Sequence, residues 1–160
     1  MQRKPLVLLC VAGLGVCGFY AFRPDTLFWG RTVNESFPAE PTSSDGSVVL
    51  AGRFHGVAHE TSGTATIHRL ADGKRVLRLT GFKTSNGPDV RVRLGKAADA
   101  TDSATVKAAG SVEVAKLKGN VGDQNYDLPA DLDLSEYRSV TIWCNRFGVN
   151  FGTAPLTSAP

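Results

Sequence analysis

One cysteine and three histidines are the side chains of this 160-residue chain best suited to redox or metal chemistry. Cys144 is the only cysteine outside an apolar N-terminal stretch, so it has no disulfide partner within its own domain. Thiolate sulfur and imidazole nitrogen bind copper, zinc and haem iron, which makes Cys144 with His55, His59 and His68 the candidate ligand set. The histidine spacing matches no established metal motif, and histidines in surface turns are the alternative.

Cys144 ends an apolar run that is expected to form a buried strand over 139–144. Val140, Ile142 and Cys144 would share one face of that strand. If this face is the core, Cys144 is a small buried hydrophobe with little reactivity. If its sulfur is accessible at the strand end, Arg146 or a histidine could stabilise the thiolate for redox chemistry. The accessibility of one atom decides between these interpretations.

The elements that would position these residues are short strands separated by turn residues. Asp72-Gly73 is typical of a tight hairpin, and the alternation in 90–94 places valine and leucine on one face and arginine on the other. About eight such strands predict an all-β fold, an antiparallel β-sandwich over 48–160. The Ala-rich stretch 96–109 could hold one helical turn or remain a loop. The expected strands are 48–54, 63–70, 75–82, 90–94, 112–117, 126–129, 139–144 and 147–154.

An uncharged apolar segment at residues 5–22 precedes the domain and is long enough for one transmembrane helix. Arg3 and Lys4 favour a cytoplasmic N-terminus, so residues 1–23 are expected to be a signal anchor that places the domain outside the cytoplasm. A cleaved signal peptide, giving a secreted protein, is the alternative. Residues 24–47 contain three prolines and are expected to form a linker.

The charged residues and turns restrict the possible partners. Export argues against nucleic acid as a partner, and no hydrolase or phosphate-loop motif predicts a stand-alone enzyme. Asn86-Gly87-Pro88-Asp89 and 117–120 are interpreted as turns, with calcium at Asp89 and Asp123 as the alternative for the first. A basic face could meet a redox partner protein or an anionic envelope polymer, or be an ordinary solvated surface; its residues are Arg69, Lys74, Arg75, Arg78, Lys83, Arg91, Arg93 and Lys96.

The order of several short motifs resembles the DM-thirteen domain over about residues 48–157. This family comprises small extracellular β modules, found beside DOMON domains and in membrane-tethered bacterial proteins. The resemblance implies electron transfer centred on the cysteine of the Trp-Cys motif, as a bare thiol or as a ligand to a group such as haem. The motifs are Gly52-x-Phe54-His55, Ser62-Gly63-Thr64-Ala65, Asp72-Gly73, Phe82, Ser85-Asn86-Gly87-Pro88-Asp89, Leu117-Lys118-Gly119-Asn120, Gly122-Asp123-Gln124-x-Tyr126-x-Leu128-Pro129, Tyr137, and Val140-x-Ile142-Trp143-Cys144-x-x-Phe147-x-Val149-x-Phe151.

Two hypotheses follow. The first is a membrane-tethered electron-transfer or thiol redox module centred on Cys144, with Trp143 and Phe147 as its neighbours. Haem or copper could bind through Cys144, and a domain without a cofactor is equally open. The second is a non-catalytic envelope-binding or adhesion module in which Cys144 is buried and silent. An inaccessible sulfur with no cavity beside it would favour the second hypothesis.

Overall fold

A computed structural model of the chain describes residues 30–38 and 47–158. The apolar segment 5–22 therefore lies outside the described residues, as does most of the expected linker. Within the described ranges, no helix is both long and apolar enough to cross a membrane.

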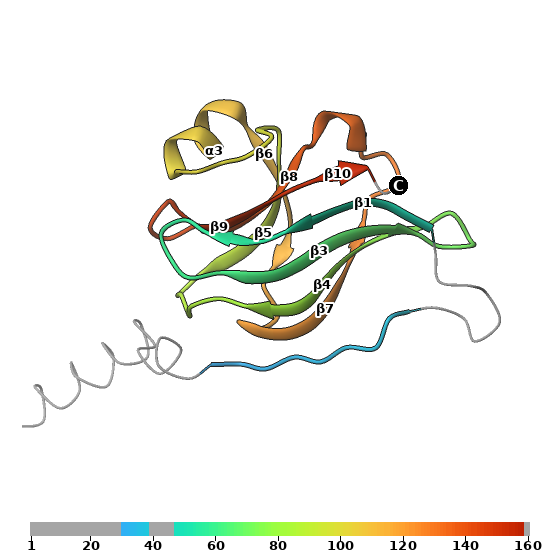
Figure 1. The fold of residues 1–160 in the computed structure, drawn as a ribbon, viewed down its shortest axis with the longest axis horizontal. Coiled ribbons are helices and arrows are strands. Elements are labelled where there is room, and N and C mark those ends of the chain that lie inside the picture. Colours follow the sequence, from blue (N-terminus) through green and yellow to red (C-terminus); the bar gives the residue numbers. More distant parts are fainter. Residues whose placement is uncertain (1–29, 39–46, 159–160) are drawn as a thin grey trace, which may run out of the picture.

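Two antiparallel sheets of five strands each pack face to face (Figure 1). The prediction of an all-β sandwich is confirmed. The first sheet consists, in spatial order, of β10 (Thr157–Ser158), β1 (Ser47–Arg53), β3 (Ser62–Arg69), β4 (Arg75–Lys83) and β7 (Val121–Leu128). The second consists of β2 (His55–Gly56), β9 (Val149–Pro155), β8 (Ser139–Cys144), β5 (Val90–Gly95) and β6 (Ser111–Lys116).

The count of about eight strands was too low, because β2 and β10 have two residues each and leave no readable alternation. The expected hairpin at Asp72-Gly73 joins β3 to β4, and Gly73 has a φ of 84°. Side chains from the facing sides of both sheets form one core, because alternate residues of each strand point inward. Fully buried members include Ile67, Leu77, Val92 and Ile142.

Strand β8 lies at the centre of the second sheet and is buried on both faces. One face joins the core between the sheets. The other is covered by a segment containing the short helix α3 (Ser103–Ala109), which lies within the Ala-rich stretch. Asp102 caps this helix by accepting a hydrogen bond from the Thr105 amide at 2.6 Å. A second short helical element, η1, spans Leu134–Glu136.

Residues 30–38 lie along the free edge of β7, as the blue segment of Figure 1 shows. The pairing is parallel: the Val33 amide donates to the Val121 carbonyl, and the Glu35 amide to the Asp123 carbonyl, each at 2.9 Å. We call residues 30–38 the edge segment. Gly122, with a φ of 102°, is required here because a side-chain carbon at this position would collide with the Val33 carbonyl oxygen. This part of the expected linker therefore belongs to the folded domain.

Candidate functional site

Cys144 is the last residue of β8, and none of its surface is exposed. It belongs to the core cluster together with Val140 and Ile142, as expected from their shared face. It is the free cysteine of the described part of the chain. Its partners across the sheet are Val90 on β5 and Val149 on β9. Directly opposed residues share a face of the sheet, so both valine side chains lie beside the sulfur.

Trp143 and Phe147, expected near the cysteine, are in different environments. Trp143 points to the opposite face of β8, where it packs with Ala100 and Val106 beneath α3. Its neighbour on that side is the Lys107 ammonium, 5.7 Å from the ring centroid. Phe147 lies in the turn between β8 and β9 with 65% of its surface exposed. The structure brings neither aromatic ring into the core cluster that surrounds the sulfur.

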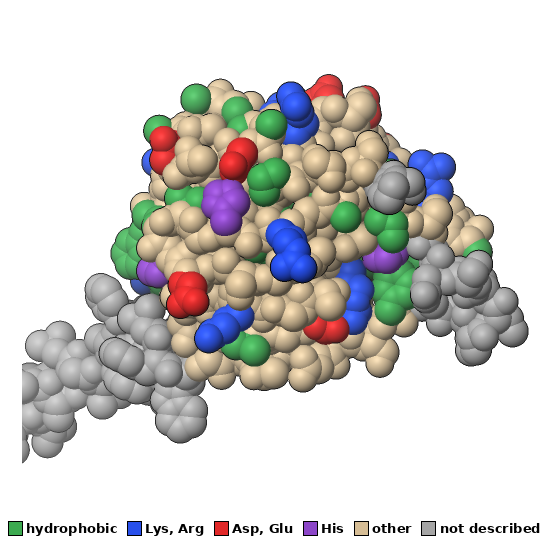
Figure 2. Space-filling view, in the orientation of Figure 1, with side chains coloured by type: hydrophobic (Ala, Val, Ile, Leu, Met, Phe, Trp, Pro, Cys, Tyr) green, Lys and Arg blue, Asp and Glu red, His purple; other side chains and the backbone are tan. Residues whose placement is uncertain are grey.

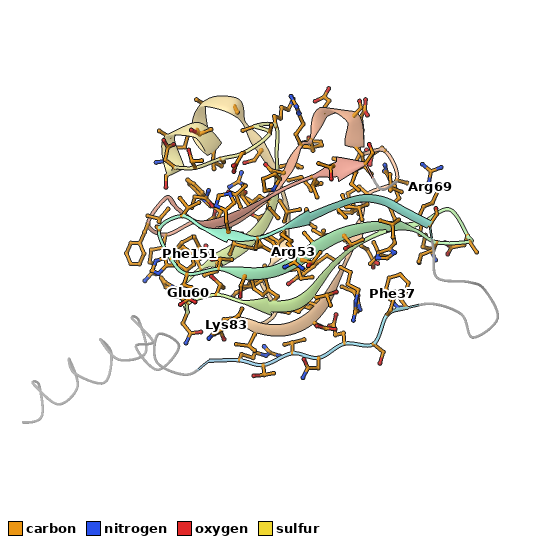
Figure 3. All side chains as sticks on the ribbon, viewed as in Figure 1. Phe37, Arg53, Glu60, Arg69, Lys83 and Phe151 are labelled. Atoms are coloured by element: carbon orange, nitrogen blue, oxygen red, sulfur yellow. The ribbon has the colours of Figure 1, made fainter. Side chains whose placement is uncertain are left out.

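The three histidines lie at separate places, each with its own partner. His55 Nε2 is 2.8 Å from Asp99 Oδ1. The His59 ring is centred 3.9 Å from that of Phe151, and the His68 ring 4.6 Å from that of Phe37. Figure 3 places Phe151 and Phe37 at opposite ends of the sandwich.

The expected metal ligands therefore do not meet. Within residues 30–38 and 47–158, no group of three or more His, Cys, Asp or Glu side chains could hold a metal ion. Asp89 and Asp123, the calcium alternative, instead bind different arginines: Asp89 lies 2.7 Å from Arg91, and Asp123 lies 2.7 Å from Arg78.

Val90, a member of the core cluster, also lines a cavity of about 540 Å³. One wall is the loop 85–90 between β4 and β5, and the other is 116–120 between β6 and β7. Arg31 of the edge segment lies at the margin. Val90 is both part of the cavity lining and the cross-strand partner of Cys144, so a residue that adjoins the cysteine also contributes to the cavity wall.

Asn120 connects the segments around the cavity through hydrogen bonds. Its amide oxygen accepts a hydrogen bond from the Arg31 backbone amide at 2.7 Å, and its amide nitrogen donates to the Thr84 carbonyl at 3.2 Å. The Thr84 amide in turn donates to the Asn120 carbonyl at 2.8 Å. The edge segment, the end of β4 and the 116–120 turn are therefore joined through one residue.

Gln124 holds the same turn from inside the fold and is completely buried. Its amide nitrogen donates to the Gly119 carbonyl at 2.9 Å, and its amide oxygen accepts from the Gly119 amide at 3.1 Å and from the Tyr126 hydroxyl at 2.7 Å. Burial raises the pKa of Tyr126 to about 12, so the hydroxyl remains a donor throughout the neutral range. The turn is rigidly supported by side-chain hydrogen bonds.

The residues lining the cavity include three cations and no carboxylate: Arg31, Lys116 and Lys118. Lys118 is compensated, because its ammonium lies 2.8 Å from the Glu35 carboxylate. The hydrogen bond from Lys118 lowers the pKa of Glu35, which is therefore ionised at neutral pH. Arg31 and Lys116 are exposed and have no ion pair with another described residue. The cavity consequently carries net positive charge.

The expected basic face is divided by the fold. Its arginines on β4 and on β5 belong to different sheets, and several of its cations are paired. Arg91 binds Asp89 and Glu113, and Lys96 binds Glu136 at 2.6 Å. Figure 2 shows basic and acidic side chains interspersed on the face in view, without a large patch of one sign. The uncompensated cations at the cavity are thus a more local feature than the sequence suggested.

The fold and the cavity can now be compared with known proteins. The family model described as Electron transfer DM13 matches residues 53–156, well over half of the chain. The chain belongs to the DM13 family. No curated protein and no solved structure gives a significant match. The suspected resemblance is thereby confirmed, and the family name indicates an electron-transfer role.

In this DM13 domain, two motifs that sequence reasoning treated as separate turns, 85–89 and 117–120, form opposite walls of one cavity. Arg31 and Lys116 were not identified as site residues from the sequence. The available signal was the density of motif residues in the two loops, together with Gly119, where a side-chain carbon would collide with the Arg31 carbonyl oxygen. Glycine at this position indicates close approach of another backbone.

The described residues do not fit a copper ion or a haem ligated by Cys144 in this arrangement. The sulfur is enclosed by packed core side chains, and Val90 and Phe151 are themselves almost completely buried. The loop that contains Gly87 packs tightly against both side chains. A side-chain carbon at Gly87 would lie 2.7 Å from Val90 Cγ2 and 3.1 Å from Phe151 Cζ. Direct ligation would require these groups to move.

Proposed function

We propose that this DM13 domain is a membrane-tethered, extracytoplasmic electron-transfer module in which Cys144 is the redox-active thiol. Family membership supports the electron-transfer role. The apolar segment 5–22, preceded by Arg3 and Lys4, supports the tether and its orientation. Cys144 is the one sulfur that the described domain offers for thiol chemistry.

The observation that carries this proposal is the position of Cys144 opposite Val90, which lines the cavity. The sulfur is covered, but it lies at the end of a strand and next to a residue that lines the cavity. The loop 85–89, which packs against Val90, is half-buried, so its movement disturbs less packing than unfolding a sheet would. Displacement of this loop would open the thiol to the cavity.

The chemistry is thiol–disulfide exchange with an exported disulfide-bearing partner. The Cys144 thiolate attacks one sulfur of the partner's disulfide; a new sulfur–sulfur bond forms, and the second partner sulfur leaves as a thiolate. The described residues contain no further cysteine to resolve this mixed disulfide. A donor thiol from a second exported molecule then attacks the Cys144 sulfur, and the partner leaves as a dithiol. A second donor thiol releases the Cys144 thiolate as the donor disulfide forms, so two electrons pass from the donor to the partner.

A second candidate function is a binding module with a silent cysteine. The complete burial of Cys144 favours it, since disulfide exchange requires access to the sulfur. The two functions differ in one property, the reactivity of Cys144 in the folded protein.

The test uses the full chain in detergent with Cys10→Ser and Cys17→Ser, which leaves Cys144 as the only thiol. Incubation with oxidised glutathione should yield a mixed disulfide under native conditions, detected by mass spectrometry, and Cys144→Ser should abolish it. An absorption spectrum and metal analysis of the unmodified chain accompany the experiment. A thiol that reacts only after denaturation would reject the redox role and leave the binding module.

A further inference from the structure

The cavity between 85–90 and 116–120 has the properties of a binding site in its own right. Its volume of about 540 Å³ lies within the range of small-molecule sites. Its walls are made by side-chain and backbone hydrogen bonds from Asn120 and Gln124, so it is formed without a ligand. Preformed walls reduce the entropy lost on binding.

The lining of the cavity combines apolar side chains with exposed cations. Val90 is 6% exposed, and Leu117 and Pro88 are half-buried. Arg31 and Lys116 are exposed, so their charges are accessible to a ligand. Apolar and cationic side chains in one lining match a ligand that has an apolar body and an anionic head.

We propose that this cavity binds a small amphiphilic anion, with the apolar body against Val90 and Leu117 and the anionic group between Arg31 and Lys116. The charges of the lining favour an anionic ligand: the lining holds no carboxylate, Glu35 is paired with Lys118, and Asp89 is paired with Arg91. Arg31 and Lys116 come from separate segments of the lining, and both carry a charge that pairs with an anionic group. Binding in the cavity does not require a thiol at position 144.

The edge segment completes this site, because it supplies Arg31. Its docking on β7 positions the arginine backbone through the Asn120 hydrogen bond at 2.7 Å. Loss of the edge segment should therefore weaken binding even where the two loops remain folded.

The test is calorimetric titration of the full chain in phosphatidylcholine nanodiscs with 2-naphthalenesulfonate, an apolar ring system with a permanent negative charge. The matched probe of opposite charge is 2-naphthylmethylammonium. The sulfonate should bind at least tenfold more tightly than the ammonium. Arg31→Gln and Lys116→Gln should each weaken its binding about two- to fivefold, as expected for exposed charges.

Arg53→Gln is the control, because Arg53 is an exposed cation on β1, which is separated from β7 by β3 and β4. It should leave the affinity unchanged, as should Cys144→Ser, which would abolish the proposed redox reaction. Adding phosphatidylglycerol to the nanodiscs distinguishes a lipid from a soluble ligand. If phosphatidylglycerol competes with the probe, the natural anion is a lipid headgroup; if it does not compete, the natural anion is a soluble molecule. Equal affinity for the two probes, or equal binding by Arg31→Gln and Arg53→Gln, would overturn the proposal.

Discussion

Val90→Ala should expose Cys144 to reagents from the cavity. Val90 lines the cavity, is the cross-strand partner of Cys144 and is 6% exposed. Shortening it to alanine removes two carbon atoms, for a transfer free energy of about 1.6 kcal/mol. Little additional loss is expected, because the space created merges with an existing cavity.

Val92→Ala is the matched control on the same strand. Val92 is completely buried opposite Ile142, away from the cavity lining. The same truncation there leaves a closed void, so the loss of unfolding free energy should be larger, roughly 2 to 3 kcal/mol. The control thus destabilises the fold more while leaving the wall over the sulfur intact.

The assay is alkylation by iodoacetamide of the full chain carrying Cys10→Ser and Cys17→Ser, followed by mass spectrometry. If Cys144 reacts only from the unfolded state, its rate follows the unfolding equilibrium. Val90→Ala would then accelerate alkylation about 15-fold and Val92→Ala roughly 30- to 150-fold, because 1.4 kcal/mol is a factor of ten. Access through the wall predicts the reverse order, with Val90→Ala the faster. Rates that track the measured loss of stability in both variants would refute the cavity route and, with it, the structural argument for a redox thiol.

Three further predictions concern the framework around the cavity. Gly122→Ala should displace the edge segment and lower the free energy of unfolding by about 1 to 3 kcal/mol. Gly73→Ala is the control for the cost of a positive φ alone, because Gly73 has a similar φ but open space around it. An equal loss of stability in both variants, measured by urea unfolding, would contradict the close contact between Gly122 and Val33. Asp123→Asn should lower the free energy of unfolding by about 1.5 to 3 kcal/mol, since the Asp123 carboxylate accepts hydrogen bonds from Arg78 at 2.7 Å and from the Gly81 amide at 2.8 Å. The control is Asp131→Asn, because Asp131 is exposed. Similar urea unfolding midpoints for the two variants would exclude a stabilising role of the Asp123 hydrogen bonds. Burial raises the pKa of Tyr126 to about 12, so this tyrosine ionises at lower pH in the unfolded chain than in the folded one. The free energy of unfolding should therefore fall by about 2 to 3 kcal/mol as the pH rises from 10 towards 12. Tyr126→Phe should remove this fall, and a pH profile of stability that is the same in both proteins would refute the role of Tyr126.

The sequence predicted those strands best whose apolar residues alternate. The range 90–94 anticipated β5 almost to the residue, because its buried valines and leucine alternate with half-buried arginines. Only the end of β7 was predicted, since its first half contains Gly122, Asp123 and Gln124. Gln124 is completely buried despite its polarity, because its amide satisfies the backbone of the neighbouring turn. A buried polar residue of this kind has no signature in a hydrophobic pattern.

The candidate site was only partly accessible to sequence reasoning. The face and burial of Cys144 follow from a period of two along β8. Placing Trp143 near the sulfur contradicts the same period, which sends adjacent residues to opposite faces. The cavity could not be predicted, because Arg31, the 85–90 loop and the 116–120 turn are distant in sequence and meet only through tertiary hydrogen bonds. The edge segment is mostly polar and ends at Pro38, so its docking depends on β7 rather than on its own propensity.

The parallel pairing of the edge segment with β7 has a consequence for the order of folding. Arg31 and its partner Asn120 are 89 positions apart, so a chain made from its N-terminus produces this segment long before the strand that receives it. Contacts of such separation form late, because a large loop must close before they are gained. Until then β7 is an uncovered strand edge, which is where newly made chains pair with one another. We therefore expect completion of the cavity rim to be a late event of folding, and the nascent chain to be more prone to aggregation until this edge is covered.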